Sequence, residues 1–424
     1  MREMKDSGIE WIGEIPKHWE VHPVYAYFEE GKTKNYRMQE QNLLSLSYGR
    51  IIRKDINTNG GLLPASFNTY NVVEAGDIII RPTDLQNDKR SLRTGLVKEQ
   101  GIITSAYIDL RPKDNVNSKY YHYLLHSYDV IKVFYNMGNG VRQGLNFSEF
   151  AKLLLLEPTT VEQQQIADYL DTKCSEIDAT AEDIQKEISL LEDYKKSVIT
   201  EVVTKGLNPD AEMKDSGVKW IGEIPVNWQA VNPRWLFAQR KDRAKKGMEQ
   251  YTASQKYGVI SQKDYMNRIG GSIVTVQKDF DILKMVCEGD FVIHMRSFQG
   301  GLEYSEHTGS ISSAYVMLIP QKNTGECRYF KWLFKSASYI NALQSTSNLI
   351  RDGQAMRYSN FIQIIIPYPP LDEQQQIADF LDTKCSEIDA IIADKKRQRG
   401  ILAEYKKSLI YEYVTGKKEV PINE

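Results

Sequence analysis

The stretch Glu162–Ala179, EQQQIADYLDTKCSEIDA, returns almost unchanged as Glu373–Ala390, EQQQIADFLDTKCSEIDA. The two copies differ only at Tyr169 and Phe380, and they lie 211 residues apart (373 − 162) in a chain of 424 residues. Each copy opens a long polar segment that ends in the same four residues, Tyr-Lys-Lys-Ser, at 194–197 and 405–408. A repeat of this length indicates a tandem duplication of one unit, made of a globular part followed by a long helix.

The segment that each copy opens carries apolar residues at the spacing of a coiled coil. In the first segment, apolar residues recur at multiples of seven on two interleaved positions: Ile177, Ile184, Leu191 and Val198, with Ala181, Ile188 and Val202. We therefore predict a helix over 162–205, roughly 66 Å long at about 1.5 Å per residue. In the second segment, Lys395 and Arg399 replace Ile184 and Ile188. Its seam is either weaker in the middle or shifted to Ile391 and Ile401.

The partner that we expect for each helix is the other copy, because a polar helix cannot bury its apolar seam alone. Residues 159–212 hold 5 basic and 13 acidic residues, whereas basic residues cluster in the middle of the second helix, at 395–399. The turn over 206–210 ends the first helix and leads straight into the second globular part. We expect an antiparallel pair with one globular part at each end and an approximate two-fold symmetry within the chain.

The expected domains are 1–158, a first recognition domain; 159–207, a first spacer helix; 208–370, a second recognition domain; and 371–424, a second spacer helix and tail. Both globular parts begin with Trp-Ile-Gly-Glu-Ile-Pro, at Trp11 and Trp220, followed by Trp19 and Trp228. Paired strand patterns and one amphipathic helix per part, over 118–135 and 328–343, indicate an α+β fold with a twisted or barrel-like sheet.

The composition and charge of the chain limit the classes of function that it can have. The net charge is −2, which argues against a simple basic nucleic-acid binder, but residues 213–370 hold 20 basic and 13 acidic residues. A locally positive surface can contact phosphates even when the total is near zero. The four cysteines form no CxxC pair, which favours reduced thiols over a disulfide framework or a zinc site. A charged N-terminus and the absence of an 18-residue apolar run predict a cytoplasmic protein.

No catalytic motif is recognisable. Gly31-Lys32-Thr33 resembles the end of a phosphate-binding loop, but Ala26 stands where that motif needs glycine. Neither Asn-Pro pair, at 208–209 or 232–233, continues into the Asn-Pro-Pro-aromatic cluster of adenine methyltransferases. His122 and His126 have the spacing of two metal ligands on a helix, but no third ligand is in sequence reach, so core or surface histidines are favoured. The chain is expected to recognise a target rather than to catalyse a reaction.

Taken together, the duplicated Trp-Ile-Gly-Glu-Ile-Pro start, the variable region and the Glu-Gln-Gln-Gln-Ile-Ala-Asp helix entry resemble the specificity subunit of type I restriction–modification systems. The resemblance spans essentially the whole chain. It implies two target recognition domains that read the two halves of a split double-stranded DNA sequence, and repeated helices that form an antiparallel coiled coil.

The resemblance also implies partners. Two methyltransferase (modification) subunits would dock on the helices and methylate adenine from S-adenosylmethionine, and restriction subunits would add ATP- and Mg-dependent translocation and cleavage. No cofactor or metal would be bound by this chain, which would have no catalytic residues of its own.

Candidate DNA-binding residues follow from the side chains that bind bases and phosphates. Arg142 and Arg351, with Gln143 and Gln354 beside them, lie in polar glycine-containing loops at corresponding places of the two halves. Further candidates for base contacts follow the first Gly-Asp strand or its counterpart: Arg81, Asn87, Lys89, Arg90 and Arg93, with Arg296 and Gln299. Candidates for phosphate contacts are Arg50, Arg53 and Lys54, with Lys256, Lys263 and Arg268.

Two other interpretations remain open at the level of sequence. The chain could be a nuclease or methyltransferase with diverged motifs, which binding of S-adenosylmethionine by the chain alone would support. It could also be a coiled-coil scaffold that joins proteins without reading DNA. The basic second half and the divergence of 20–140 from 230–345, set against nearly identical helices, speak against a scaffold.

Overall fold

The computed structural model describes residues 2–57, 64, 66–85, 91–137, 144–271, 282–346 and 356–421. The chain divides into two compact units. Unit 1 joins Met1–Ile184 to Arg397–Glu424, and unit 2 is the continuous stretch Gln185–Lys396. Each unit therefore contains one half of each long helix, and each is described by itself below.

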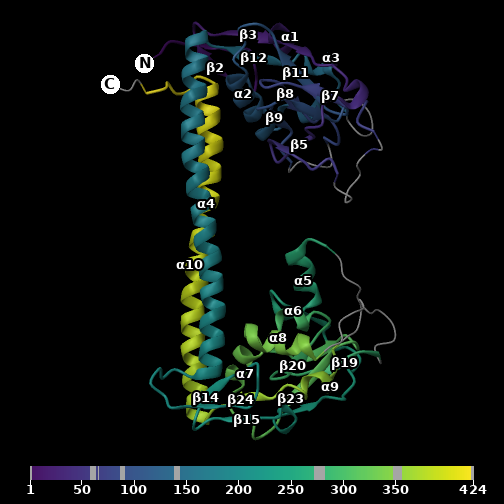
Figure 1. Ribbon diagram of the computed structural model, residues 1–424, viewed down its shortest axis with the longest axis vertical. Coiled ribbons are helices and arrows are strands. Elements are labelled where there is room, and N and C mark those ends of the chain that lie inside the picture. Colours follow the sequence, from purple (N-terminus) through teal and green to yellow (C-terminus); the bar gives the residue numbers. More distant parts are fainter. Residues whose placement is uncertain are drawn as a thin grey trace. The chain divides into compact units, whose positions relative to one another are not determined.

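Two long helices carry both units. Helix α4 spans Thr160–Lys205 and helix α10 spans Leu371–Val414, so both predicted long helices are confirmed. Figure 1 shows them side by side within each unit, α4 in teal and α10 in yellow at its C-terminal end. A helix of 46 residues, such as α4, is about 69 Å long.

Ion pairs show that the helices run antiparallel in each unit. In unit 2, Lys195 pairs with Asp389 at 2.6 Å, whereas Glu187, earlier on α4, pairs with Lys395, later on α10. In unit 1, Lys406 pairs with Asp178 at 2.7 Å. Also in unit 1, the hydroxyls of Tyr169 and Tyr413 lie 3.2 Å apart, which gives the same direction. The opposite charges that predict pairing of the two helices thus form ion pairs between them.

The apolar seam between the helices does not shift in its polar middle. Ile184 and Ile188 of α4 and Ile388 and Ile392 of α10 are buried, as the seven-residue spacing predicts. The alternative seam residues of α10 are exposed, Ile391 by 47% and Ile401 by 61%. Of the two possibilities for α10, the weaker seam is therefore the one observed.

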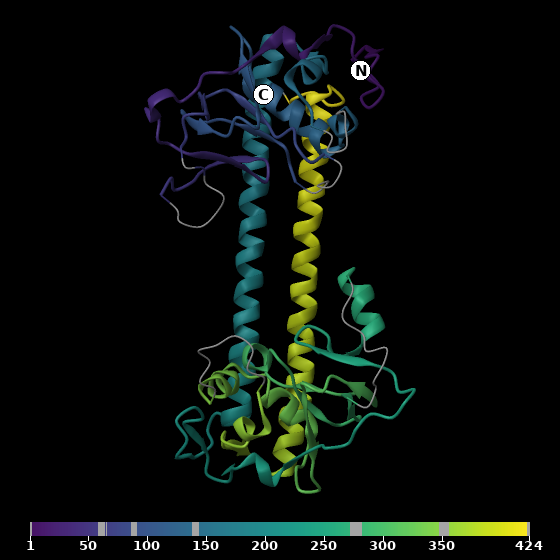
Figure 2. The same cartoon turned by 90° about the vertical axis from the view of Figure 1, so that its right-hand side faces the viewer.

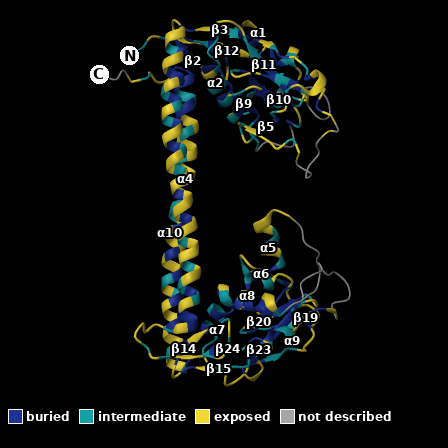
Figure 3. Cartoon of the chain, in the orientation of Figure 1, coloured by how far each residue is buried: buried dark blue, intermediate teal, exposed yellow. Residues whose placement is uncertain are grey.

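A four-stranded antiparallel sheet forms the centre of each globular part, and the two sheets have corresponding strand orders. In unit 1 the order is β4 (Phe28–Glu30), β11 (Ile108–Pro112), β8 (Ile78–Ile80) and β9 (Thr94–Leu96). In unit 2 it is β16 (Phe237–Gln239), β23 (Val316–Pro320), β20 (Phe291–Ile293) and β21 (Glu303–Tyr304). The two middle strands of each sheet, β11 and β8 in unit 1 and β23 and β20 in unit 2, are mostly buried (Figure 3). The α+β class and the internal repeat are both confirmed.

Shorter elements surround each sheet. In unit 1 they are β1 (Met4–Asp6), β2 (Glu14–Pro16), β3 (Glu20–Pro23), α1 (Val24–Tyr27), η1 (Tyr36–Met38), β5 (Leu44–Ser47), β6 (Arg50–Arg53), β7 (Asn71–Val73), β10 (Gly101–Ile103), α2 (Ser118–Val130), η2 (Val133–Asn136), α3 (Phe147–Phe150) and β12 (Leu154–Glu157). In unit 2 they are β13 (Met213–Asp215), β14 (Glu223–Pro225), β15 (Gln229–Val231), η3 (Pro233–Trp235), β17 (Tyr251–Ser254), β18 (Gly258–Ser261), α5 (Gln262–Ile269), β19 (Lys284–Val286), α6 (Ser297–Gly300), β22 (Gly309–Ile311), α7 (Cys327–Leu333), α8 (Ala337–Ser345), α9 (Tyr358–Phe361) and β24 (Ile366–Tyr368).

The short helix expected in each globular part is broken in both. In unit 1, α2 ends at Val130, and Lys132 in the left-handed region (φ +66°) separates it from η2. In unit 2, Ser336 accepts a hydrogen bond from the backbone N–H of Tyr339 and starts α8 as a new helix. A residue with positive φ and a serine N-cap both interrupt a helix locally, and aromatic spacing alone does not show this.

A tryptophan anchors the helix entry in each unit. The indole N–H of Trp228 donates to Glu373 in the first turn of α10 at 2.7 Å, and that of Trp19 donates to Glu162 at the start of α4 at 3.4 Å. Both indoles are fully buried. The repeated glutamate of the helix entry thus binds the repeated tryptophan of the globular part.

The C-terminal end of the other long helix meets the same tryptophan. Gly416 (φ +69°) follows α10 against Trp19, and Gly206 (φ +81°) follows α4 against Trp228. A Cβ added at Gly416 would lie only 2.5 Å from Pro16, so glycine is required there for space as well as for its backbone conformation. Each unit therefore joins the start of one long helix to the end of the other.

One buried carboxylate distinguishes the two sheets. Asp109 on β11 lies beside Asp77, and its oxygens receive no hydrogen bond from a donor among the described residues. The corresponding residue of unit 2, Met317 on β23, is apolar. Burial, followed by the charge of Asp77, raises the pKa of Asp109 to about 7.

We expect Asp109→Asn to stabilise unit 1 above neutral pH. Since the pKa of Asp109 is higher in the folded than in the unfolded chain, its contribution to stability is lost as pH rises from about 4 through about 7. The variant should gain at most about 4 kcal/mol in the free energy of unfolding at pH 8 and little at pH 4. Urea unfolding at both pH values measures the difference, with the exposed Asp114→Asn as control. An equal effect of Asp109→Asn at both pH values would contradict the assignment.

Among the described residues, no helix combines the length and the apolar character needed to cross a membrane.

Candidate nucleic-acid interface

Each unit has a β-hairpin whose turn ends in Tyr-Gly. The hairpins are β5–β6 in unit 1 and β17–β18 in unit 2, and both are antiparallel. The tyrosines are Tyr48 and Tyr257, and the glycines after them have positive φ, +77° at Gly49 and +67° at Gly258. Tyr48 is 84% exposed, which is unusual for a side chain of its size. The hairpins are therefore a shared, solvent-facing feature of two otherwise divergent domains.

Basic residues predicted for phosphate contact gather on the unit 1 hairpin. Arg50 and Arg53 lie on β6, Lys54 follows it, and all three side chains are exposed. Arg50 pairs with Asp178 of α4 at 3.0 Å, and Arg53 pairs with Glu99. Exposed ion pairs contribute at most about 1 kcal/mol, so both arginines can exchange their carboxylate partners for phosphates.

The corresponding hairpin of unit 2 forms a basic and aromatic cluster with α5. The Lys256 ammonium and the Arg268 guanidinium each lie 5.1 Å from the centre of the Tyr257 ring, and Tyr265 of α5 packs edge-on against that ring. Lys263 lies on the same helix, and Lys256, Lys263 and Arg268 are all exposed. The structure thus brings together the three predicted phosphate-contact residues of this unit.

Arg296 and Gln299 adjoin the same hairpin. Arg296 is the residue before α6 and Gln299 lies within it, and both are exposed. The side chain of Gln255, in the hairpin turn, donates to the backbone carbonyl of Arg296 at 3.0 Å. Five candidate residues of unit 2 therefore lie on three neighbouring elements.

Arg93 is a correction to the sequence-based prediction, because its side chain is fully buried. Its guanidinium donates to the backbone carbonyl of Asp84 and to the Tyr135 hydroxyl, both at 2.9 Å, and to the carbonyl of Thr83. A buried arginine needs several acceptors, and these backbone oxygens supply them. Arg93 therefore organises the core instead of facing DNA, whereas Arg81 at the end of β8 is half-buried.

The remaining predicted contacts, Arg142, Gln143, Arg351, Gln354, Asn87, Lys89 and Arg90, lie outside the described residues. His122 and His126 lie on α2 and are half-buried, and desolvation lowers the pKa of the first to about 3 and of the second to about 4. The sequence favours core or surface histidines over metal ligands for this pair. Sequence reasoning missed Tyr48 and Tyr257, although the repeated letters Tyr-Gly in both halves were a signal for them.

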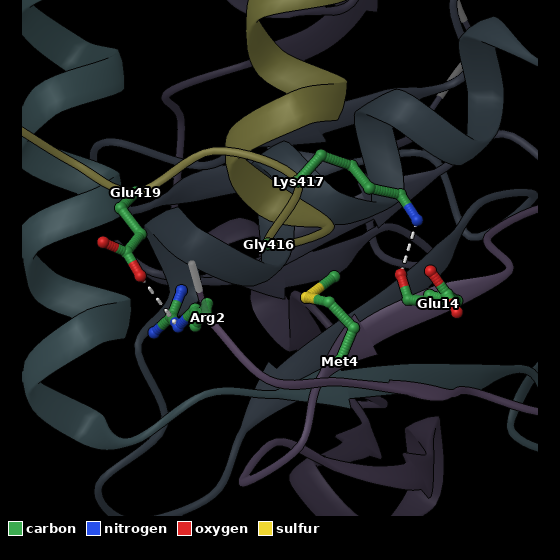
Figure 4. A pocket seen from close by; sticks show the side chains of 6 residues that line it. All are labelled: Arg2, Met4, Glu14, Gly416, Lys417 and Glu419. Carbon is green, nitrogen blue, oxygen red and sulfur yellow. Dashed lines mark hydrogen bonds and ion pairs between the residues drawn. The ribbon is translucent and has the colours of Figure 1, made fainter.

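A pocket at the end of α10 in unit 1 has a structural role. It is lined by Arg2, Met4, Glu14, Gly416, Lys417 and Glu419. Figure 4 shows Arg2 paired with Glu419 and Lys417 donating to the backbone carbonyl of Glu14, so both cations of the lining have acceptors within it. These contacts fasten the N-terminal segment to the end of the helix.

The geometry defines a class of protein: a duplicated α+β chain carried on two long antiparallel helices, with a basic, aromatic hairpin in each unit. The family model of the type I restriction modification DNA specificity domain matches residues 30–190 and 225–398. The chain therefore belongs to this family, and it carries the domain twice.

Two relatives agree with this membership, and a solved structure shares the fold. The putative type I restriction enzyme MjaX specificity subunit of Methanocaldococcus jannaschii is 24% identical over 430 residues, 96% of each chain. The MjaVIII specificity subunit of the same organism is 23% identical over 333 residues, 76% of this chain and 75% of that one. A chain from a structure on complex assembly and conformational transition of the type I R-M system has a TM-score of 0.68. It is 13% identical, over 95% of this chain and 99% of that chain, and shows a common fold.

Proposed function

We propose that this chain is the DNA-recognition subunit of a type I restriction–modification complex, in which each unit reads one half of a split double-stranded target. The observation that carries the proposal is the contrast within the repeat. Both units bind the long helices through the same tryptophan, glutamate and glycine contacts, whereas the regions 20–140 and 230–345 diverge. A common frame with divergent surfaces is what two different half-sites require.

The proposed partners are two methyltransferase subunits and the restriction subunits of the complex. Exposed apolar residues recur on the long helices at positions 211 residues apart: Leu190 and Tyr194 on α4, and Ile401 and Tyr405 on α10. Each pair is spaced by four residues, so its side chains neighbour each other on the helix surface. Two similar surfaces suit two copies of one methyltransferase subunit. A scaffold without DNA readout would leave the basic hairpins unexplained.

Catalysis is proposed to belong to those partners, which would use S-adenosylmethionine, ATP and Mg. The chain itself is proposed to be non-catalytic, with no bound cofactor. Its proposed place of action is the cytoplasm, where host and invading DNA are accessible.

The test is a map of methylated adenines in a host that carries this chain and its methyltransferase subunits. The expected result is one motif with two defined half-sites separated by unspecified bases. Exchange of residues 230–345 for the same region of another family member should change only one half-site. No motif at all, or a change in both half-sites after the exchange, would refute the proposal.

A further inference from the structure

Helix α5 of unit 2 is held as a helix although none of its residues is buried. Figures 1 and 2 both show α5 projecting from the rest of unit 2. An isolated helix of eight residues is unstable in water. Here Ser261 caps its first turn, through a 3.1 Å hydrogen bond from the backbone N–H of Asp264, and Gly270 ends it in the left-handed region. The fold therefore holds a capped short helix, whose outer surface is exposed among the described residues.

The outer surface of α5 carries groups that bind bases and phosphates. Lys263 and Asn267 are exposed, lie four residues apart on one face, and have no side-chain partner among the described residues. The guanidinium of Arg268 lies 5.1 Å from the centre of the Tyr257 ring, which orients it.

The one acidic side chain of α5 is already engaged. Asp264 accepts a hydrogen bond from the Ser261 hydroxyl at 3.0 Å, at the N-terminal cap. Lys256, whose ammonium lies 5.1 Å from the centre of the Tyr257 ring, adds a further positive charge. The exposed face is thus positive and rich in donors, as a DNA-facing element must be.

We propose that α5 is the base-reading helix of unit 2, a role that rests on the proposed DNA recognition. An α-helix with its side chains is about 10–12 Å across, which fits the DNA major groove, about 12 Å wide. Asn267 and Arg268 contact base edges, since asparagine pairs with adenine and arginine with guanine through two hydrogen bonds each. Lys256 and Lys263 contact the flanking phosphates.

Within the described residues the two units differ at this place, which fits two different half-sites. After β6 of unit 1, the described residues 54–57, 64 and 66–70 form no α-helix, whereas β18 of unit 2 leads directly into α5. The hairpin is shared and the helix is particular to unit 2 within the described parts. We therefore assign sequence-independent contact to the hairpins and base discrimination in unit 2 to α5.

The test compares methylated-adenine maps of hosts that carry the wild-type or a variant chain with its methyltransferase subunits. Asn267→Ala and Arg268→Ala should each relax the preference at one or two positions of the same half-site, by roughly 5- to 150-fold, and leave the other half-site unchanged. Arg268→Lys should also relax the motif, since lysine keeps the charge but not the paired donors. Lys322→Ala, an exposed lysine of the same unit after β23, is the matched control and should leave the motif unchanged.

The outcomes separate the two proposals. A wild-type map without a split motif refutes the proposed function and, with it, the role of α5. A split wild-type motif that both α5 variants leave unchanged overturns the role of α5 alone. Uniform loss of methylation without relaxed bases, in variants with wild-type melting temperature, also overturns base reading.

Discussion

Replacing Trp228 by alanine should lower the free energy of unfolding of unit 2 by about 3–5 kcal/mol. Trp228 is fully buried, its indole N–H donates to Glu373 at 2.7 Å, and Gly206 at the end of α4 lies against its ring. The substitution removes the largest side chain of this core and leaves a cavity where both long helices meet the globular part. It also leaves Glu373 without its indole donor.

Hydrogen exchange measured by mass spectrometry gives the effect for each unit separately, and urea unfolding followed by circular dichroism gives the total. Trp235→Ala is the matched control, because Trp235 is 61% exposed and, among the described residues, its ring stacks only with Arg234. It should cost no more than about 1 kcal/mol. Similar losses from the two substitutions would show that the tryptophan at the helix ends has no special role.

Arg93→Ala should destabilise unit 1 by about 3–5 kcal/mol without changing the DNA motif. The guanidinium is buried and satisfies two backbone carbonyls and the Tyr135 hydroxyl, and the Arg93 backbone N–H donates to the buried carboxylate of Asp129. Burial raises the pKa of Asp129, and the donated hydrogen bond opposes this rise. Loss of the guanidinium leaves several buried acceptors unpaired.

Arg53→Ala is the matched control in the same unit, because Arg53 is exposed and pairs only with Glu99 among the described residues. Its stability should change by at most about 1 kcal/mol. Urea unfolding gives the stabilities, and methylated-adenine maps at a temperature where both variants are folded give the motif. A changed motif with unchanged stability for Arg93→Ala would return this residue to the DNA surface.

The sequence predicts the two long helices and the contacts at their ends better than the candidate DNA-facing residues, for a physical reason. The helix entry recurs because Glu162 and Glu373 bind equivalent tryptophans, and Gln163 and Gln374 are buried against Pro158 and Pro369. Such contacts demand the same residues twice, so comparison of the two halves within one chain reveals them. The antiparallel direction follows from the short turn after α4 and from the charge pattern.

Comparison of the two halves does not distinguish arginines in exposed loops from arginines in the core. Arg93 follows a polar stretch, and only the fold shows that Thr83, Asp84 and Tyr135 close around it. The breaks after Val130 and before Ser336 depend on single backbone conformations that aromatic spacing does not reveal. Asn267 belongs to a helix of only eight residues, too short for a periodic signal.

The discontinuity of unit 1 sets the order in which the chain can fold as it is synthesised. Leu409, Ile410, Tyr413 and Val414 belong to the core of unit 1, although Gln185–Lys396 precede them in the chain. Unit 1, whose globular part is synthesised first, therefore completes its core only after α10 has been synthesised. Unit 2 can complete its core earlier, although it is synthesised second. Until then the apolar residues that surround Trp19 in unit 1 lack the side chains of α10 that cover them in the folded unit.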